Sequence, residues 1–266
     1  MNHPWMAVMV AVATFLGCFS WQPVATAKDK SRGERTALIV YRPPVRGAPS
    51  SRVGGGVRGV NQDLPNLEAL VPEHTGYTSQ PQPSLYWFIS KPSRAEMEII
   101  LLDDNPLAID PILATTMTMD RAGFYRLDLA KFNIRLKPGV EYQWSVTIMG
   151  DPEHPSGDIV SGGGVKYVEK SQMLQEVLSE AHKREHGIIF AREGYWYDAI
   201  TELSEKILVN PDSRKFRKLR AQLLEQAGLT QAAAAELIKY RQLEKISKHR
   251  RPESQRRIIQ AKDIHP

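Results

Sequence analysis

Residues 140–148 read VEYQWSVTI, and this stretch decides the fold class of the chain. Its apolar residues occupy every second position, which is the period of a β-strand that buries one face and exposes the other. The same alternation recurs between Leu67 and Val168. The runs that share it are 85–89, 96–101, 125–129 and 142–148.

Turn-forming residues separate these runs. They are KP at 91–92, DDNP at 103–106, KPG at 137–139 and GDP at 150–152. With these breaks, about six or seven short strands fit roughly one hundred residues, as in immunoglobulin-like domains. We therefore expect residues 63–169 to form an antiparallel immunoglobulin-like β-sandwich, with Trp87 or Trp144 filling its core.

From Ser171 onward the apolar period becomes helical, with a shared face formed by Leu174, Val177, Leu178, Ala181 and Ile188. A shift of 34 residues aligns two copies of the following pattern. The aligned pairs are Gly187 with Ala221, Phe190 with Leu224, Gly194 with Gly228, Ala199 with Ala233, and Leu203 with Leu237. This period, with small residues at contacts and glycine at the turn, resembles the tetratricopeptide repeat. The prediction is an α+β chain that ends in a short tetratricopeptide-like α-helical array over 170–247.

Tyr195, Trp196 and Tyr197 form the densest aromatic cluster of the chain. Two repeats are fewer than the three or more that such arrays need, so the helical pair should lean on the sandwich or on another chain. Aromatic side chains dominate both protein cores and binding hot spots. We interpret the cluster as packing onto the sandwich, with contact to a partner peptide or glycan as the alternative.

The first 27 residues contain no Lys, Arg, Asp or Glu and include an apolar run from Met6 to Phe19. The triplet Ala25-Thr26-Ala27 that follows has the form of a signal-peptide cleavage site. We expect residues 1–27 to be a signal peptide and the mature chain to begin at Lys28. An uncleaved anchor and lipidation at Cys18 are the alternatives, and either still implies export.

An extended segment rich in Arg, Gly and Pro is expected over residues 28–62. It contains Arg46, Arg52 and Arg58 among glycine-rich turns, and such turns together with arginine can bind an anion. The segment lacks the Lys-Ser/Thr ending of a nucleotide-binding loop. The first interpretation is a loop packed across the next domain, and anion or partner binding through the three arginines is the second.

Several short motifs in and after this segment resemble the domain-of-unknown-function 928 family. They are YRPP at 41–44, RGAP at 46–49, RVGGG at 52–56, LEALVPE at 67–73 and QPSLYW at 82–87. The resemblance extends over roughly Tyr41 to Ser204. It implies an exported bacterial protein of the Gram-negative periplasm, and it implies no activity and no catalytic residues.

His182-Lys183-Arg184-Glu185-His186 matches H-x-x-E-H, a zinc-binding motif of metalloproteases. Zinc catalysis needs two imidazoles on one side of a helix, a glutamate base and a third protein ligand downstream. No further histidine lies at a useful position, since His249 and His265 fall in the basic tail. We interpret the five residues as an exposed helix surface, with a zinc-dependent hydrolase as the alternative.

The sequence also lacks the motifs of two other kinds of site, a nucleophilic catalytic site and a phosphate-binding cofactor site. There is no G-x-S-x-G nucleophile elbow and no glycine-rich cradle that opens a helix, so no catalytic residue and no cofactor are expected. The single cysteine cannot build a disulfide framework.

The charge of +5 is distributed unevenly along the 266 residues. From Asn210 to the end, 14 Lys and Arg oppose 6 Asp and Glu, and residues 248–266 form a basic tail. We interpret this end as a solvated helix face and tail, with contact to an anionic surface as the alternative; nucleic acid is not an expected partner outside the cytoplasm. The expected function is an exported, non-enzymatic periplasmic binding or scaffold protein with a protein or envelope partner and no membrane anchor after cleavage.

Overall fold

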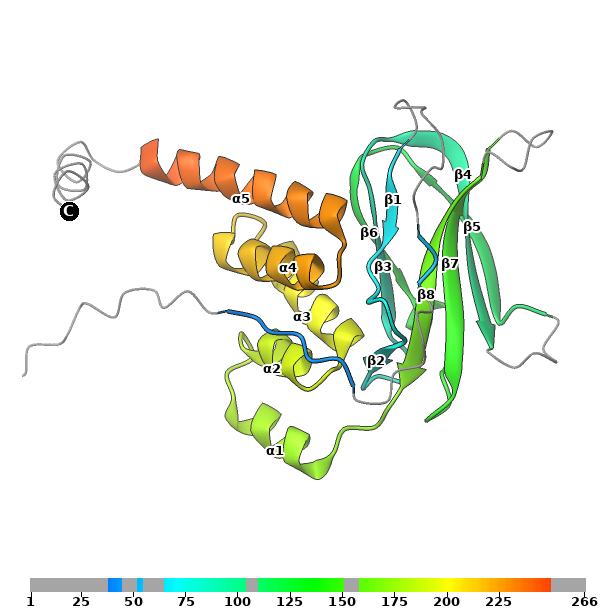
Figure 1. Cartoon of the computed structure of the whole chain (residues 1–266), viewed down its shortest axis with the longest axis horizontal. Helices are drawn as coiled ribbons and strands as arrows, with labels where there is room; N and C mark the ends of the chain where they lie inside the picture. The colour runs from blue at the N-terminus through cyan, green and yellow to red at the C-terminus, as the bar shows by residue number, and fades with distance from the viewer. Residues whose placement is uncertain (1–37, 45–51, 55–64, 104–109, 151–157, 250–266) are drawn as a thin grey trace, which may run out of the picture. The chain divides into compact units, whose positions relative to one another are not determined.

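The computed structural model describes residues 38–44, 52–54, 65–103, 110–150 and 158–249, all within one compact unit. The expected signal peptide, Cys18, Arg46, Arg58 and residues 250–266 of the basic tail lie outside the described residues. The described chain is α+β, with eight strands in two sheets and five α-helices (Figure 1).

The larger sheet has five strands in the order β2-β8-β7-β4-β5. Neighbouring strands are antiparallel, except that β2 runs parallel to β8. Its strands are β2 (Gly76–Thr78), β4 (Ser93–Asp103), β5 (Leu113–Met119), β7 (Glu141–Ile148) and β8 (Ile159–Tyr167). The alternation in β7 is confirmed, because Tyr142, Trp144, Val146 and Ile148 are buried and the residues between them are half-buried.

The smaller sheet is antiparallel and has the order β1-β3-β6. Its strands are β1 (Leu67–Ala69), β3 (Ser84–Ile89) and β6 (Gly123–Asp128), and a short 3-10 helix, η1 (Leu129–Phe132), follows β6. Leu85, Trp87 and Leu127 point to one face of this sheet, and they belong to the same hydrophobic core as the buried side chains of the larger sheet. The two sheets are thus joined through one continuous core.

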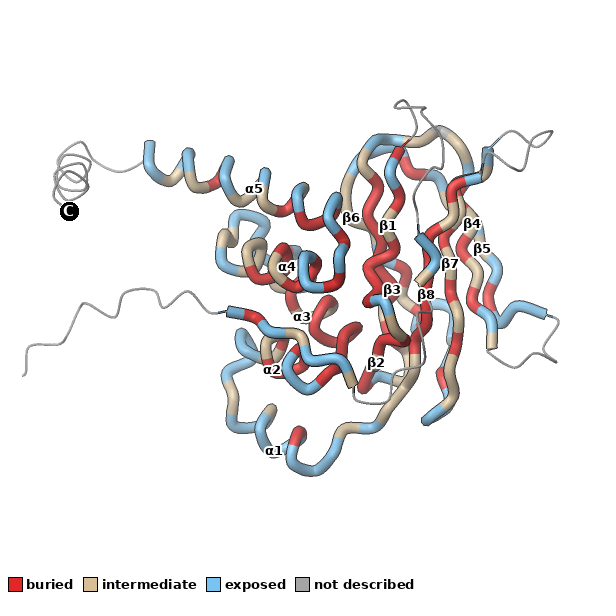
Figure 2. Tube along the Cα trace, viewed as in Figure 1, coloured by how far each residue is buried: buried red, intermediate tan, exposed pale blue. Residues whose placement is uncertain are grey.

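The second face of the smaller sheet is buried as well. Tyr86 and Phe88 lie on the side of β3 opposite to Trp87, yet both are buried. Figures 1 and 2 show why, since the helices lie on one side of β1, β3 and β6 and the larger sheet lies on the other. The sequence predicted one buried face for each strand, and this part of the prediction is wrong for β3, because the helices replace solvent on its second face.

Five helices follow β8. They are α1 (Gln172–Glu180), α2 (His186–Arg192), α3 (Trp196–Val209), α4 (Arg214–Gln226) and α5 (Thr230–His249). Gly194 joins α2 to α3 and Gly228 joins α4 to α5, and both adopt the left-handed conformation, with φ of 83° and 69°. These angles strain any residue with a Cβ, which explains why glycine occupies the same place in both hairpins.

The expected continuous helix from Leu174 to Ile188 is not present, because α1 ends at Glu180 and residues 182–185 form a turn. Ala181 is extended, and the ring Nε2 of His186 donates a hydrogen bond to the carbonyl of Leu178 at 3.1 Å. That carbonyl belongs to the last turn of α1, where no backbone N–H of the helix can reach it. A side chain of the next helix therefore satisfies the end of α1.

Residues 38–44 cross the helices without forming a strand. The side-chain amide of Gln226 accepts from the Tyr41 N–H at 2.9 Å and donates to the Ile39 carbonyl at 3.0 Å. The Arg42 N–H donates to the Ala191 carbonyl at 3.1 Å. This segment therefore connects α2 with α4.

Candidate functional site

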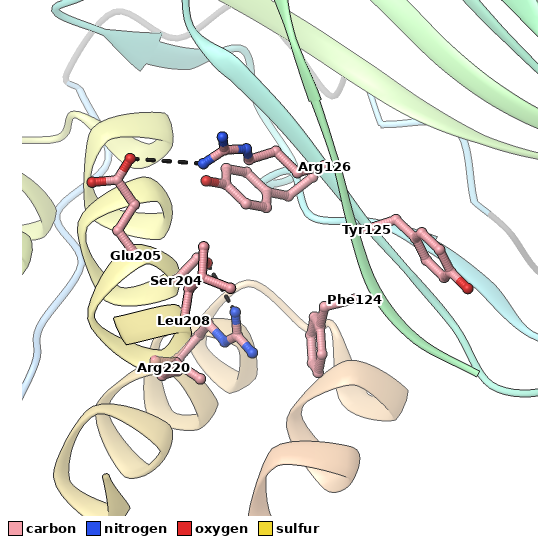
Figure 3. A pocket seen from close by; sticks show the side chains of 9 residues that line it. Phe124, Tyr125, Arg126, Ser204, Glu205, Leu208 and Arg220 are labelled. Carbon is pink, nitrogen blue, oxygen red and sulfur yellow. Dashed lines mark hydrogen bonds and ion pairs between the residues drawn. The ribbon is translucent and has the colours of Figure 1, made fainter. Parts of the chain in front are cut away.

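A cleft of about 240 Å³ lies where the helices meet the smaller sheet (Figure 3). The side chains that line it come from β3, β6, α3 and α4. They are Tyr86, Phe124, Tyr125, Arg126, Ser204, Glu205, Ile207, Leu208 and Arg220. On the sheet side, Phe124 and Arg126 belong to the outer face of β6 because they lie two residues apart, and Tyr86 is paired with Arg126 across the strands. The cleft therefore exists because aromatic residues occupy the outer face of this sheet.

Tyr86 brings an unpaired polar group to this cleft. Its side chain is buried, and its hydroxyl makes no hydrogen bond of normal geometry among the described residues. Burial raises the pKa of Tyr86, and the nearby side chains of Arg126, Thr201 and Ser84 oppose part of that rise. The hydroxyl stays protonated at neutral pH and is available to donate a hydrogen bond, which is an uncommon state for a buried polar group.

Arg220 forms the opposite wall from α4. Its guanidinium lies 4.1 Å from the ring centre of Phe124, donates to Ser204 Oγ at 2.9 Å and pairs with Glu236 of α5. Burial lowers the pKa of Arg220, and the Glu236 carboxylate opposes this effect. Arg217 also reaches Glu236, at 3.1 Å. The buried cation is thus compensated and, by stacking on Phe124, joins the helices to the sheet.

The Arg126 guanidinium pairs with Glu205 across the cleft at 3.7 Å (Figure 3). It also pairs with Asp128 on its own strand at 2.7 Å. The side chains of Arg126 and Glu205 are 35% and 51% exposed, so solvent screens their attraction. Leu208, which also lines the cleft, is 73% exposed. The rim of the cleft therefore combines one weak ion pair with one exposed aliphatic side chain.

A second pocket, of about 430 Å³, adjoins the cleft, and Glu205 lines both. Its described lining is about half polar and includes the hydroxyl, amide and carboxyl groups of Gln80, Thr201, Glu202 and Asp198. Asp198 is buried and accepts from the Ser79 N–H at 2.7 Å and from the Ser79 hydroxyl at 2.5 Å. Burial raises the pKa of Asp198, and the hydrogen bonds from Ser79 oppose the rise.

The H-x-x-E-H residues do not share a helix, so the expectation of an exposed helix surface is corrected. His182 and Glu185 are exposed in the turn between α1 and α2, whereas His186 begins α2 and is bonded to Leu178. A zinc site of this type requires both imidazoles on one side of a continuous helix. Among the described residues, no group of three or more His, Cys, Asp or Glu is arranged to hold a metal ion.

The aromatic cluster at 195–197 is buried, with Trp196 fully inaccessible. The Trp196 Nε1–H donates to the Leu70 carbonyl at 2.7 Å, and the Tyr197 hydroxyl accepts from Trp144 Nε1 at 2.8 Å and donates to the Gly164 carbonyl at 2.9 Å. Tyr195 donates to the Glu169 carbonyl at 3.0 Å. These contacts pack the start of α3 against β7, β8 and the residue after β1, which fits the interpretation of the cluster as packing onto the sandwich and not the alternative of partner contact.

Of the three candidate arginines, only Arg52 lies among the described residues. Its guanidinium donates to the Ala227 carbonyl at the end of α4, at 2.5 Å. This contact fits the interpretation of a loop that packs across the following domain. Arg46 and Arg58 lie outside the described residues.

Sequence reasoning missed the residues that build the cleft. Tyr86 lies in the strand predicted at 85–89, on the face expected to contact solvent, although it is a large aromatic residue, and Phe124 lies just before the run predicted at 125–129. Such a residue is the signal that could have indicated a second covered face. Arg220 gave no usable signal, because it is one of five cations in α4.

Among the helices that the structure describes, none is long and apolar enough to cross a membrane. No curated protein matches the sequence. A solved structure of a multi-domain immunophilin from Arabidopsis thaliana is 8% identical and matches over 75% of this chain and 100% of that chain, but its TM-score of 0.17 carries no argument. The family model described as Domain of Unknown Function (DUF928) matches residues 53–237, so the chain belongs to the DUF928 family.

Proposed function

We propose that the protein is an exported, non-enzymatic binding or scaffold protein of the Gram-negative periplasm, and that the cleft between α3, α4 and the smaller sheet is where it contacts a partner protein. The observation that carries this proposal is the buried, unpaired hydroxyl of Tyr86 in an aromatic-walled cleft. An unpaired buried donor costs about 1–3 kcal/mol, and a partner that supplies an acceptor would recover part of that cost.

The rim of the cleft supports a protein partner. Leu208 extends the apolar lining outward near the end of α3. Apolar centres with polar rims are typical of protein-binding sites. The proposal includes an immunoglobulin-like sandwich and a tetratricopeptide-like array, two architectures that present binding surfaces.

The helices α4 and α5 supply a second surface, for envelope contact. They contain nine Lys and Arg against three Glu, a net charge of +6. Glu236 compensates Arg217 and Arg220, but Lys215, Lys239, Arg241 and Lys245 are exposed. A cationic surface attracts anionic lipid, polysaccharide or an acidic protein face.

Site-specific photocrosslinking in intact cells tests the cleft. A benzophenone amino acid replaces Leu208 at the rim or, as a matched control, Met173, which is equally exposed on α1. We expect a discrete protein adduct from position 208 that is absent from position 173 and weakened by Tyr86→Phe. No adduct from position 208, or the same adduct from both positions, would overturn the proposal.

The alternative, a zinc-dependent hydrolase, has no observation in its favour, because the turn at 182–185 separates its two histidines. Metal analysis distinguishes the two function classes. Stoichiometric zinc in the purified mature protein that disappears in a His182→Ala, His186→Ala double variant would support the hydrolase and contradict the binding protein.

A further inference from the structure

We infer that the cleft and its polar neighbour form one two-part site for an extended peptide segment of a partner protein, with an apolar side chain in the cleft and a Lys or Arg side chain in the polar pocket. This inference rests on the proposed function and specifies the chemistry of the partner.

The two pockets share an edge and two walls. Glu205 lines both, Ser84 and Tyr86 continue the wall of β3 from one pocket to the other, and α3 forms the opposite side. Since Ser84 and Tyr86 lie two residues apart on one strand face, the wall is continuous. A linear ligand that follows β3 therefore reaches both pockets.

The cleft end favours an uncharged apolar group beside a hydrogen-bond acceptor. Phe124, Ile207 and Leu208 provide an apolar lining. The cations near it are already paired, Arg220 with Glu236 and Arg126 with Asp128 and Glu205, so the cleft offers no net charge to an ion. Two buried donors of the lining make no hydrogen bond, the Tyr86 hydroxyl and Arg220 Nε, and both suit the carbonyl of a peptide next to a Leu, Ile or Phe side chain.

The polar end favours a cation. Asp198, Glu202 and Glu205 line it, and its described lining contains no Lys or Arg. Three cations approach these carboxylates from outside: Lys206 pairs with Glu202 at 3.2 Å, Arg126 pairs with Glu205 at 3.7 Å, and Lys170 lies near Asp198. His186 also lines the pocket, but its Nε2 is bonded to Leu178. An incoming guanidinium or ammonium would compete with these partly exposed cations for the carboxylates.

The Arg126–Glu205 pair divides the two parts. It is half-exposed and long, at 3.7 Å, so it contributes little stability. A bound peptide can replace it, with its own cation taking the place of Arg126 beside Glu205. This exchange couples the polar end to the cleft end.

Fluorescence anisotropy with labelled peptides tests the inference on the full mature protein. The probe is a short peptide in which two serines separate Leu from Arg, and the controls replace Leu with Ser or Arg with Glu. We expect saturable binding of the probe, with a dissociation constant below about 1 mM, and about tenfold weaker binding of each control. Raising the salt concentration should weaken the probe more than the Arg-to-Glu control.

Substitutions in the protein test which part of the peptide binds in the cleft and which part binds in the polar pocket. Glu202→Gln should weaken the probe about tenfold and should not weaken the Arg-to-Glu control, because it removes a like charge that repels the glutamate of that peptide. Tyr86→Phe should weaken the probe and the Arg-to-Glu control alike, without lowering the thermal midpoint. Met173→Asp is the matched surface control and should change nothing. Equal binding of all peptides, or no effect of Glu202→Gln, would overturn the two-part site. If crosslinking at position 208 persists in that case, the proposed binding function stands without this partner chemistry.

Discussion

Trp196 and Tyr197 are adjacent residues whose ring atoms reach both sheets from one helix. Each has a polar atom at the far end of a large apolar ring, and each of these atoms is hydrogen-bonded in the core. Trp196 also meets the ring of Tyr41 edge to face, with ring centres 5.0 Å apart. Burial of such rings and satisfaction of their polar tips together fix the position of α3.

Trp196→Ala should therefore destabilise the folded protein strongly. Removal of a fully buried Trp leaves a cavity and an unpaired Leu70 carbonyl, and such truncations cost about 3–5 kcal/mol. Chemical denaturation of the mature chain measures the loss. Met173→Ala, at an exposed position, serves as the control and should change stability by less than about 0.5 kcal/mol. A Trp196→Ala variant as stable as the wild type would mean that this ring is not part of the core.

Asp198 makes stability depend on pH. Because burial raises its pKa in the folded state, its contribution is fully present below the unfolded pKa of about 3.9 and is lost as the pH rises through the folded pKa. Lys170 and the bonds from Ser79 limit this loss. The unfolding free energy of the wild type minus that of Asp198→Asn should fall as the pH rises from acid to neutral.

Denaturation curves measured across that pH range test whether the difference in unfolding free energy falls as the pH rises. Asp120→Asn, at an exposed position in the sharp turn before β6, is the control and should track the wild type. A difference between wild type and Asp198→Asn that is constant or grows with pH would contradict the prediction.

At the scale of elements, the two helix hairpins offer a matched pair of turns. Gly194 and Gly228 both have positive φ, but a Cβ at Gly194 would lie 3.0 Å from the Arg42 carbonyl oxygen, whereas the nearest atom at Gly228 is 3.7 Å away. Gly228→Ala should cost about 1–2 kcal/mol from backbone conformation alone. Gly194→Ala should cost more, because the crossing segment at 38–44 must also shift. Urea denaturation compares the variants, and equal losses would show that the close approach to Arg42 is unimportant.

The helices should not fold without the sheets. In an isolated fragment of residues 171–248, Trp196 and Tyr197 would lose their sheet partners, and Arg220 would lose Phe124. We expect weak helicity by circular dichroism and no cooperative thermal transition. A cooperative transition in the fragment would refute this dependence on the sheets.

The alternation of apolar residues was enough to predict the strands at 85–89 and 142–148, and the glycines at 194 and 228 marked both helix turns. The cleft could not be predicted in the same way. Whether the outer face of β3 contacts water or a helix depends on where α3 and α4 dock, and that docking uses contacts between distant residues such as Arg220 and Phe124. The end of α1 was missed for a similar reason, since it depends on a bond from His186 to Leu178. The period of apolar residues indicates which face of a helix or strand is buried, but it does not indicate which other element covers that face.

For the whole molecule, export remains a prediction from residues outside those the structure describes. We expect the purified periplasmic protein to begin at Lys28, because residues 1–27 are uncharged and end in a small-residue cleavage site. Intact-mass spectrometry identifies the first residue. A retained leader, or a diacylglyceryl group on Cys18, would contradict cleavage after Ala27.

The crossing of residues 38–44 over the helices also affects the order in which contacts form as the chain folds. Ribosomes make the chain from its amino end, yet Tyr41 finds its partner in Gln226, 185 residues later. Until α4 has been made, the Tyr41 N–H and the Ile39 carbonyl therefore lack the Gln226 side chain that binds both of them. Contacts so distant along the chain form slowly and close late. A chain that stops before α4 would leave residues 38–44 without their contact to Gln226. Docking of the last helices is therefore the step that completes the fold, and an unfinished chain is expected to bind chaperones.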